Sequence, residues 1–200
     1  MEKFYFEVPS LERKEEAIDY INELYEYHSD TNGTGGLERY LDDYEGWLEK
    51  LEDDYTREPN EEKVPARTYF LVRENDQKII GMINIRLALN EKLKRIGGHI
   101  GYSIRPTERK KGYNKINLYL GLKVCQEYGI DKVLMDADTS NKASWKTMEA
   151  LGGINIREYY DVEFSKCMVK DYEIDVLKAL QEHKEEYESF IVLKEVAKKK

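Results

Sequence analysis

The sequence Ser103-Ile104-Arg105-Pro106-Thr107-Glu108-Arg109-Lys110-Lys111-Gly112-Tyr113-Asn114 joins the end of a predicted strand to the start of a predicted helix. At such a junction the first backbone N–H groups of the helix have no intrahelical partner. The helix dipole adds partial positive charge at the same place. Together these features predict an anion site that suits a pyrophosphate.

The side chains of this junction strengthen that prediction. Arg109, Lys110, Lys111 and Lys115 gather four positive charges in a chain whose 32 basic and 40 acidic residues give a net charge of −8. Gly112 lets the backbone approach a phosphate without a side-chain clash. A solvated basic turn at a helix start would show the same residues, so the charge pattern alone leaves both readings open.

The elements on either side predict an α/β (α+β) fold. Branched and aromatic runs predict strands at 4–8, 67–73, 78–89 and 96–105, and helical spacing predicts helices between residues 11 and 51, the second from Leu37 to Leu51. Downstream we expect a helix over 114–128, a strand within 131–138, a helix over 141–151, and strands at 154–164 and 168–176. This order predicts a mixed, mostly antiparallel twisted sheet flanked by helices.

The basic junction resembles the coenzyme A motif of the GNAT superfamily, Arg/Gln-x-x-Gly-x-Gly/Ala. Residues 109–113 fit this motif, whereas Asn114 stands where the family usually has a small residue. The resemblance implies that coenzyme A contacts Arg109, Lys110, Lys111, Gly112, Tyr113 and Asn114. It also implies that Ile104, Arg105 and Pro106 end the family's fourth strand, whose backbone pairs with the pantetheine arm. The Ile104 backbone would then bind the thioester carbonyl.

A second stretch resembles another GNAT motif, the helix written Asn-x-x-Ser/Ala…Glu-x-x-Gly. Asn141 and Ser144, followed by residues 149–153, fit it, and the resemblance implies that both side chains face coenzyme A. A plain helix cap at Asn141 and a surface serine are the alternative. The resemblance spans about 68–176 and points to a bacterial branch of unassigned substrate.

The extent of the resemblance sets the expected domain organisation. We expect a single GNAT domain over residues 1–176, with its core at about 68–176 and N-terminal helices at 11–51 over the acceptor site. Residues 177–200 read as a charged, helical C-terminal extension, which could join a homodimer.

Proton transfer has one histidine candidate. His99 lies on the strand that leads into the predicted coenzyme A site, and histidine titrates in the range that a general base needs. A core histidine with satisfied nitrogens is the alternative. GNAT enzymes often place a tyrosine acid four residues before the glycine of the second motif, but Met148 stands there. Water or one of four tyrosines could replace it: Tyr102, Tyr113, Tyr159 or Tyr160.

Polar residues near strand ends are candidates for the acceptor pocket. Asn84 and Arg86 share one face of their strand, and Asp136 and Asp138 share a face of theirs. Acidic groups could hold a cationic amine, although turn and cap carboxylates would give the same pattern.

These observations predict an acetyl-CoA-dependent N-acetyltransferase that acts on a primary amine by direct transfer in a ternary complex. The alternatives are a non-catalytic coenzyme A sensor and a site for another phosphate ligand, such as a nucleotide. The acidic balance argues against nucleic-acid binding, and no clustered His/Cys spacing suggests a metal. Two cysteines, no apolar leader and no membrane-length apolar stretch predict a cytoplasmic protein.

Overall fold

A four-stranded antiparallel sheet forms the centre of the structure, a computed structural model that describes residues 2–192. The strands lie in the order β1 (Phe4–Glu7), β2 (Ala66–Arg73), β3 (Ile79–Arg86) and β4 (Ile100–Ile104). Along β2, Tyr69 and Leu71 face one apolar cluster, whereas Phe70 and Val72 face another. Both faces of this sheet are therefore apolar, and both need covering layers.

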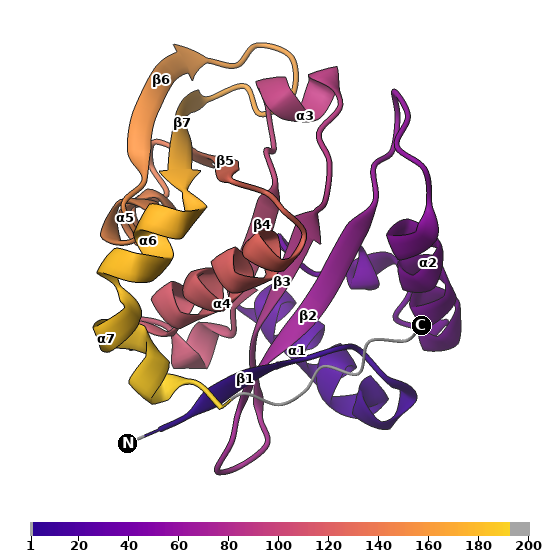
Figure 1. The fold of residues 1–200 in the computed structure, drawn as a ribbon. Helices are drawn as coiled ribbons and strands as arrows, with labels where there is room; N and C mark the ends of the chain where they lie inside the picture. The colour runs from indigo at the N-terminus through magenta and orange to yellow at the C-terminus, as the bar shows by residue number, and fades with distance from the viewer. Residues whose placement is uncertain (1, 193–200) are drawn as a thin grey trace.

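Helices supply those layers (Figure 1). On one face lies α4 (Tyr113–Glu127), and on the other lie α1 (Lys14–Glu26) and α2 (Tyr44–Thr56). The second helix starts later than the expected Leu37, because the Asp43 side chain accepts from the Gly46 N–H at 3.0 Å and caps α2 there. Residues 37–39 instead form one 3-10 turn.

A second, three-stranded antiparallel sheet stands beside the first. Its order is β5 (Lys132–Asp138), β7 (Met168–Asp175) and β6 (Ile154–Tyr160). Three helices accompany these strands: α5 (Lys142–Ala150), α6 (Val176–Glu182) and α7 (Lys184–Tyr187). The short helix α3 (Glu91–Arg95), which the sequence did not predict, begins where Asn90 accepts from the Leu93 N–H. The architecture confirms the predicted α+β class.

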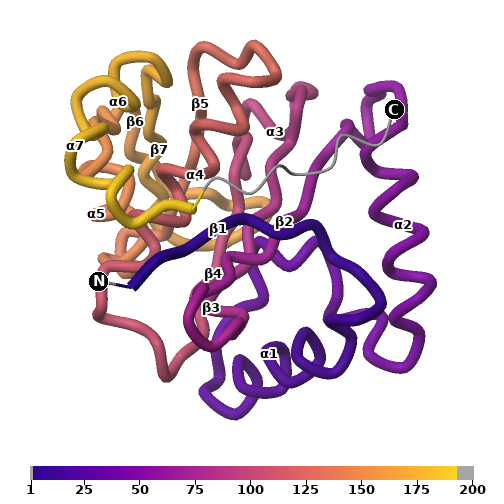
Figure 2. The backbone as a smooth tube through the Cα atoms, turned by 60° about the horizontal axis from the view of Figure 1, so that its bottom comes forward, coloured from indigo at the N-terminus to yellow at the C-terminus, as the bar shows by residue number. Residues whose placement is uncertain are grey.

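The last described residues of the chain lie beside the first strand, β1 (Figure 2). Ile191 forms a parallel bridge with Phe4, and the Val192 N–H donates to the Phe4 carbonyl at 2.9 Å. The described part of the segment after Val176 thus packs along α4 and ends beside β1. Residues 193–200, including the three terminal lysines of the expected tail, lie outside the described residues.

The two sheets meet where β4 begins. The His99 N–H donates to the Leu134 carbonyl at 2.7 Å, and beyond this point β4 and β5 belong to different sheets. Gly98 permits the contact: its φ is +53°, and a Cβ there would lie 2.1 Å from the Leu134 oxygen. Glycine in a strand often marks a bulge or the close approach of another group. The group that approaches is the backbone of β5.

Replacing Gly98 by alanine tests this contact. The positive φ costs an L-residue about 1–2 kcal/mol, and the clash is with backbone that cannot move without shifting β5. We expect G98A to lose about 3 kcal/mol or more of the free energy of unfolding in urea. G129A is the control, because Gly129 also has positive φ but nothing within 4 Å of its Cβ position. Equal losses in the two variants would contradict the account.

Candidate active site

The edge of β4 that faces away from β3 is open. Arg105 donates its N–H to the Ile80 carbonyl at 2.8 Å, and the register between β3 and β4 runs unbroken from Ile104 to Ile100. In an antiparallel pair, successive residues point their N–H and C=O groups alternately toward and away from the neighbouring strand. Tyr102 and Ile104 therefore direct their main-chain groups into the gap, where no strand of the described residues pairs with them.

The start of α4 lies just beyond that edge. Gly112 is the N-cap residue, with φ +83°, and no side chain caps the helix. Side chains do close the N-termini of α2, α3, α5 and α6: Asp43, Asn90, Asn141 and Asp175. Nothing lies within 4 Å of a Cβ built on Gly112. The first turn of α4 therefore offers main-chain N–H groups to an anion across open space.

Cationic side chains surround this helix start. Among the described residues, Arg109, Lys110 and Lys115 form no ion pair, so their charges are available to a ligand. Lys111 differs, because its Nζ lies 2.7 Å from Oε2 of the buried Glu108. Arg109 donates from Nε to the Ile104 carbonyl at 3.1 Å, which connects the basic loop to the open strand edge.

Arg105 points away from the expected ligand. Its side chain is 2% exposed and pairs with Asp19 and Glu23 of α1, while Nε donates to the Ile79 carbonyl. Its main-chain N–H is used by β3. Only its backbone continues the strand edge, so the expectation that Arg105 contacts coenzyme A does not extend to its guanidinium. Pro106 opens the 3-10 turn of residues 106–108 that follows.

Asn141 and Ser144 lie across the gap from β4. Asn141 caps α5 by accepting from the Ser144 N–H at 3.1 Å, as its alternative reading predicted. The Tyr102 hydroxyl lies 3.1 Å from both the carbonyl and the hydroxyl oxygen of Ser144. Burial raises the pKa of Tyr102, so this hydroxyl keeps its proton at neutral pH. The Tyr102 side chain thus connects β4 to α5.

His99 holds the backbone of β5. Its Nδ1 accepts from the Leu134 N–H at 3.0 Å, so the proton of the neutral ring is on Nε2. Burial lowers the pKa of His99 to about 4. The one nitrogen that could take a proton is already an acceptor, and a base this weak suits amine deprotonation poorly. This geometry argues against the expected role of His99 as the base and favours its alternative reading as a core histidine, with Nδ1 bound to the Leu134 N–H.

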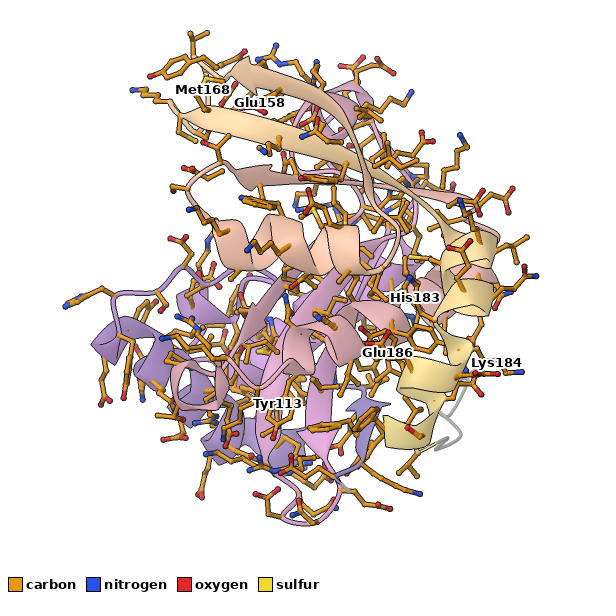
Figure 3. The ribbon with its side chains drawn as sticks, turned by 90° about the vertical axis from the view of Figure 1, so that its left-hand side faces the viewer. Tyr113, Glu158, Met168, His183, Lys184 and Glu186 are labelled. Atoms are coloured by element: carbon orange, nitrogen blue, oxygen red, sulfur yellow. The ribbon has the colours of Figure 1, made fainter. Side chains whose placement is uncertain are left out.

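The four tyrosines considered as acids are spread over the molecule. Tyr113, in the lower half of the view in Figure 3, donates to Glu2. Tyr159 and Tyr160 donate to the Arg95 and Lys166 carbonyls, at the β6 end where Figure 3 labels Glu158 and Met168. Only the Tyr102 hydroxyl lies at the gap. Met148, where the family has its tyrosine, is 1% exposed and belongs to the core.

The four residues considered for an amine pocket form hydrogen bonds within the protein itself. Arg86 donates to the Gly97 and Gly98 carbonyls at 2.8 Å, and Asp136 accepts from the Gly97 N–H at 2.6 Å. Both therefore shape the glycine turn before β4. Asn84 donates to the Thr68 hydroxyl, and Asp138 accepts from the Ser140 N–H in a turn. Each has an internal structural partner.

Two carboxylates that the sequence did not single out support the basic loop. Glu108 is 6% exposed and binds both terminal nitrogens of Arg73, at 3.0 and 3.1 Å. Glu23 reaches the same loop from α1, accepting from the main-chain N–H of Thr107 at 2.9 Å. Glu23 and Thr107 are 84 positions apart, so no local pattern could have connected them.

Comparison with protein families decides the identity. The family model described as Acetyltransferase (GNAT) domain matches residues 13–154. The chain belongs to the GNAT acetyltransferase family. It is therefore an acyltransferase of the N-acetyltransferase class, and family membership implies acetyl transfer that depends on acetyl-CoA. No curated protein matches the chain.

Solved structures share the fold of this GNAT protein. Ribosomal-protein-S5-alanine acetyltransferase from Vibrio fischeri is 14% identical with a TM-score of 0.64, over 88% of this chain and 94% of that one. Mycobacterium smegmatis RimJ in complex with CoA-disulfide is 12% identical with a TM-score of 0.66, over 90% and 89%. The microcin C7 self immunity acetyltransferase MccE, in complex with acetyl-CoA and AMP, is 17% identical with a TM-score of 0.61, over 86% and 92%.

The described part of this GNAT protein lacks two features. Within residues 2–192, no helix is long and apolar enough to cross a membrane. The same part of the chain holds no group of three or more His, Cys, Asp or Glu side chains that could bind a metal ion.

The buried His99 of this GNAT domain predicts a specific pH dependence. Because its folded pKa, about 4, lies below the ordinary 6.5, the unfolded chain binds the extra proton first. The stabilisation is present at neutral pH and is lost as pH falls from about 6.5 toward 4. At 1.36 kcal/mol per pKa unit, wild type should lose about 2 kcal/mol more than H99N between pH 7 and pH 5.

Urea unfolding at the two pH values measures this difference. Asparagine is the matched substitution, because its side-chain oxygen can accept the Leu134 N–H but does not titrate. Parallel losses in wild type and H99N would show that His99 is not a neutral acceptor buried between the sheets.

Proposed function

We propose that this protein transfers an acetyl group from acetyl-CoA to a primary amine, directly and within a ternary complex. One observation carries the proposal: the unpaired main-chain edge of β4 leads, within a few residues, to an uncapped helix start with free cations. A donor such as acetyl-CoA carries a diphosphate, an arm with amide groups and a thioester. It needs an anion site and a strand edge next to each other, as they are here.

The residues present fit acetyl-CoA. The N–H groups at the start of α4, with Arg109, Lys110 and Lys115, would hold the diphosphate. The unpaired edge of β4 at Tyr102 and Ile104 would line the gap that receives the pantetheine arm. The Ile104 N–H would donate to the thioester carbonyl, where negative charge develops when an amine attacks. Acetyl-CoA supplies the activated acyl group.

The proton of the attacking amine must go elsewhere than to His99. Its Nδ1 already accepts from the Leu134 N–H, so we assign proton removal to water at the acceptor side of the gap. The thiolate that leaves can take a proton from water or from Tyr102, whose hydroxyl is protonated at neutral pH. Direct transfer needs no nucleophile from the protein, and no covalent acyl-enzyme is proposed.

The acceptor would enter beside α1 and the loop at Gly33. A Cβ on Gly33 would lie 2.6 Å from the Gly101 carbonyl oxygen, so this loop lies directly against β4. Proteins of the same fold carry names that include ribosomal-protein-S5-alanine and spermidine/spermine. A useful amine panel therefore contains an alanine-first peptide, spermidine, a lysine peptide and an aminoglycoside.

A second function, a coenzyme A sensor without turnover, has one observation in its favour. Met148 occupies the position of the family's tyrosine acid and is buried in the core. The sensor and the enzyme share the binding site, so turnover is the measurement that separates them. Thiol release from acetyl-CoA with any amine of the panel, at the same rate in H99N as in wild type, supports the enzyme and water as the base. Tight binding without thiol release supports the sensor.

The phosphate contacts predict how binding responds to substitution. Replacing Arg109 by alanine removes a charge from the proposed diphosphate site without opening the core, since Arg109 is exposed. We expect the dissociation constant for coenzyme A, measured by calorimetry, to rise about tenfold, which equals about 1.4 kcal/mol. K63A, an exposed lysine on the loop between α2 and β2, is the matched charge control. Equal binding by R109A and K63A would contradict the assigned site.

A further inference from the structure

The carboxylate of Glu23 binds two parts of the predicted donor site at once. Its Oε2 accepts from Arg105 Nη1 at 2.7 Å. Its Oε1 accepts from the Thr107 N–H at 2.9 Å and from the Thr107 hydroxyl at 2.8 Å. Glu23 lies on α1, 82 and 84 positions away in sequence. One side chain therefore fastens the residues on both sides of Pro106 to a helix on the opposite sheet face.

Arg105 transmits this restraint to the strand end. Its guanidinium is 2% exposed and also donates from Nε to the Ile79 carbonyl at 3.0 Å. Its main-chain N–H donates to the Ile80 carbonyl. The residue that directly follows Ile104 is thus held through its backbone by β3 and through its side chain by α1. The Ile104 N–H has little freedom to turn away from the gap.

Thr107 transmits the same restraint to the basic loop. It is the middle residue of the 3-10 turn Pro106–Glu108, which leads directly to Arg109 and the uncapped start of α4. Its main-chain N–H and its hydroxyl both donate to the same oxygen of Glu23, Oε1. The direction in which this turn leaves β4 is therefore set from α1.

We propose that Glu23 is a positioning residue, which holds the Ile104 N–H and the phosphate-binding loop in fixed register through Arg105 and Thr107. This inference rests on the proposed function, because it concerns the same donor site. A donor that spans both parts binds well only if their spacing is fixed in advance. A displacement of about 1 Å at such a site can cost about 100-fold in rate.

The charge of Glu23 fits this role. Burial raises its pKa, but the hydrogen bonds from Thr107 and Arg105 outweigh burial and leave the pKa below the ordinary value. Glu23 is ionised at neutral pH and accepts at both oxygens. A glutamine has one acceptor oxygen and one NH₂ group, so a donor would replace one of the two oxygens with which Glu23 accepts from Arg105 and from Thr107.

Asp19 provides the matched control. Its Oδ2 lies 2.7 Å from the same Arg105 Nη1, but its side chain is 69% exposed and binds only Arg105 among the described residues. D19N and E23Q each remove one negative charge beside Arg105. Only E23Q also releases the basic loop. The two substitutions therefore separate positioning from simple charge balance.

Calorimetry with coenzyme A tests the proposal. We expect E23Q to raise the dissociation constant about tenfold, as for the loss of hydrogen bonds to a charged group, and D19N to change it less than twofold. Equal effects of E23Q and D19N, or no effect of E23Q, would overturn the positioning role. Wild-type protein that binds no coenzyme A would instead overturn the proposed function, and this inference with it.

Substitutions of Thr107 test the same proposal if E23Q does not fold. Thr107 is exposed, so T107V should unfold at a temperature close to that of wild type. We expect T107V, which lacks the hydroxyl donor to Glu23, to weaken coenzyme A binding severalfold. T107S, which keeps the hydroxyl, should restore it. Binding by T107V equal to wild type, or equal losses in T107V and T107S, would overturn the proposal.

Discussion

The open edge of β4 depends on a backbone contact between the two sheets. At the start of β4, the His99 N–H and ring nitrogen bind the carbonyl and the N–H of Leu134, and Gly98 lets the two backbones come that close. Past this contact the strands belong to different sheets. An edge strand normally exposes unpaired groups that proteins cover or charge. Here the separation beyond the contact leaves one edge of β4 without a partner strand among the described residues of this GNAT domain.

The surroundings of that edge are arranged to complete a donor site. On one side, α4 begins without a cap and with three cations that have no ion-pair partner among the described residues. On the other, α1 holds the end of β4 and the basic loop through Glu23. The acidic helix α1 thus acts on the donor site through hydrogen bonds across the sheet. The contacts that hold the donor site rigid join residues far apart in the sequence. The groups that would bind the donor are main-chain groups of neighbouring residues.

The sequence predicted the features that depend on neighbouring residues. Strand and helix order followed from periodicity, and the basic junction followed from charge and Gly112. Side-chain roles could not be predicted where long-range partners decide them. The sequence made His99 a candidate base, but in the structure its ring nitrogen accepts from the Leu134 N–H. Arg86 and Asp136 were candidates for the acceptor pocket, but both bind the main chain of Gly97. Glu23 gave no signal, because its partners are more than 80 positions away.

Residue-resolved amide hydrogen exchange, measured with and without acetyl-CoA, tests the central claim most directly. The account predicts that the N–H groups of Tyr102 and Ile104 exchange quickly in the free protein and slow markedly when acetyl-CoA binds. Those of Ser103 and Arg105, which face β3, should exchange slowly in both states. Slow exchange of all four amides in the free protein, or acetyl-CoA binding without protection of Ile104, would contradict an open strand edge that receives the donor.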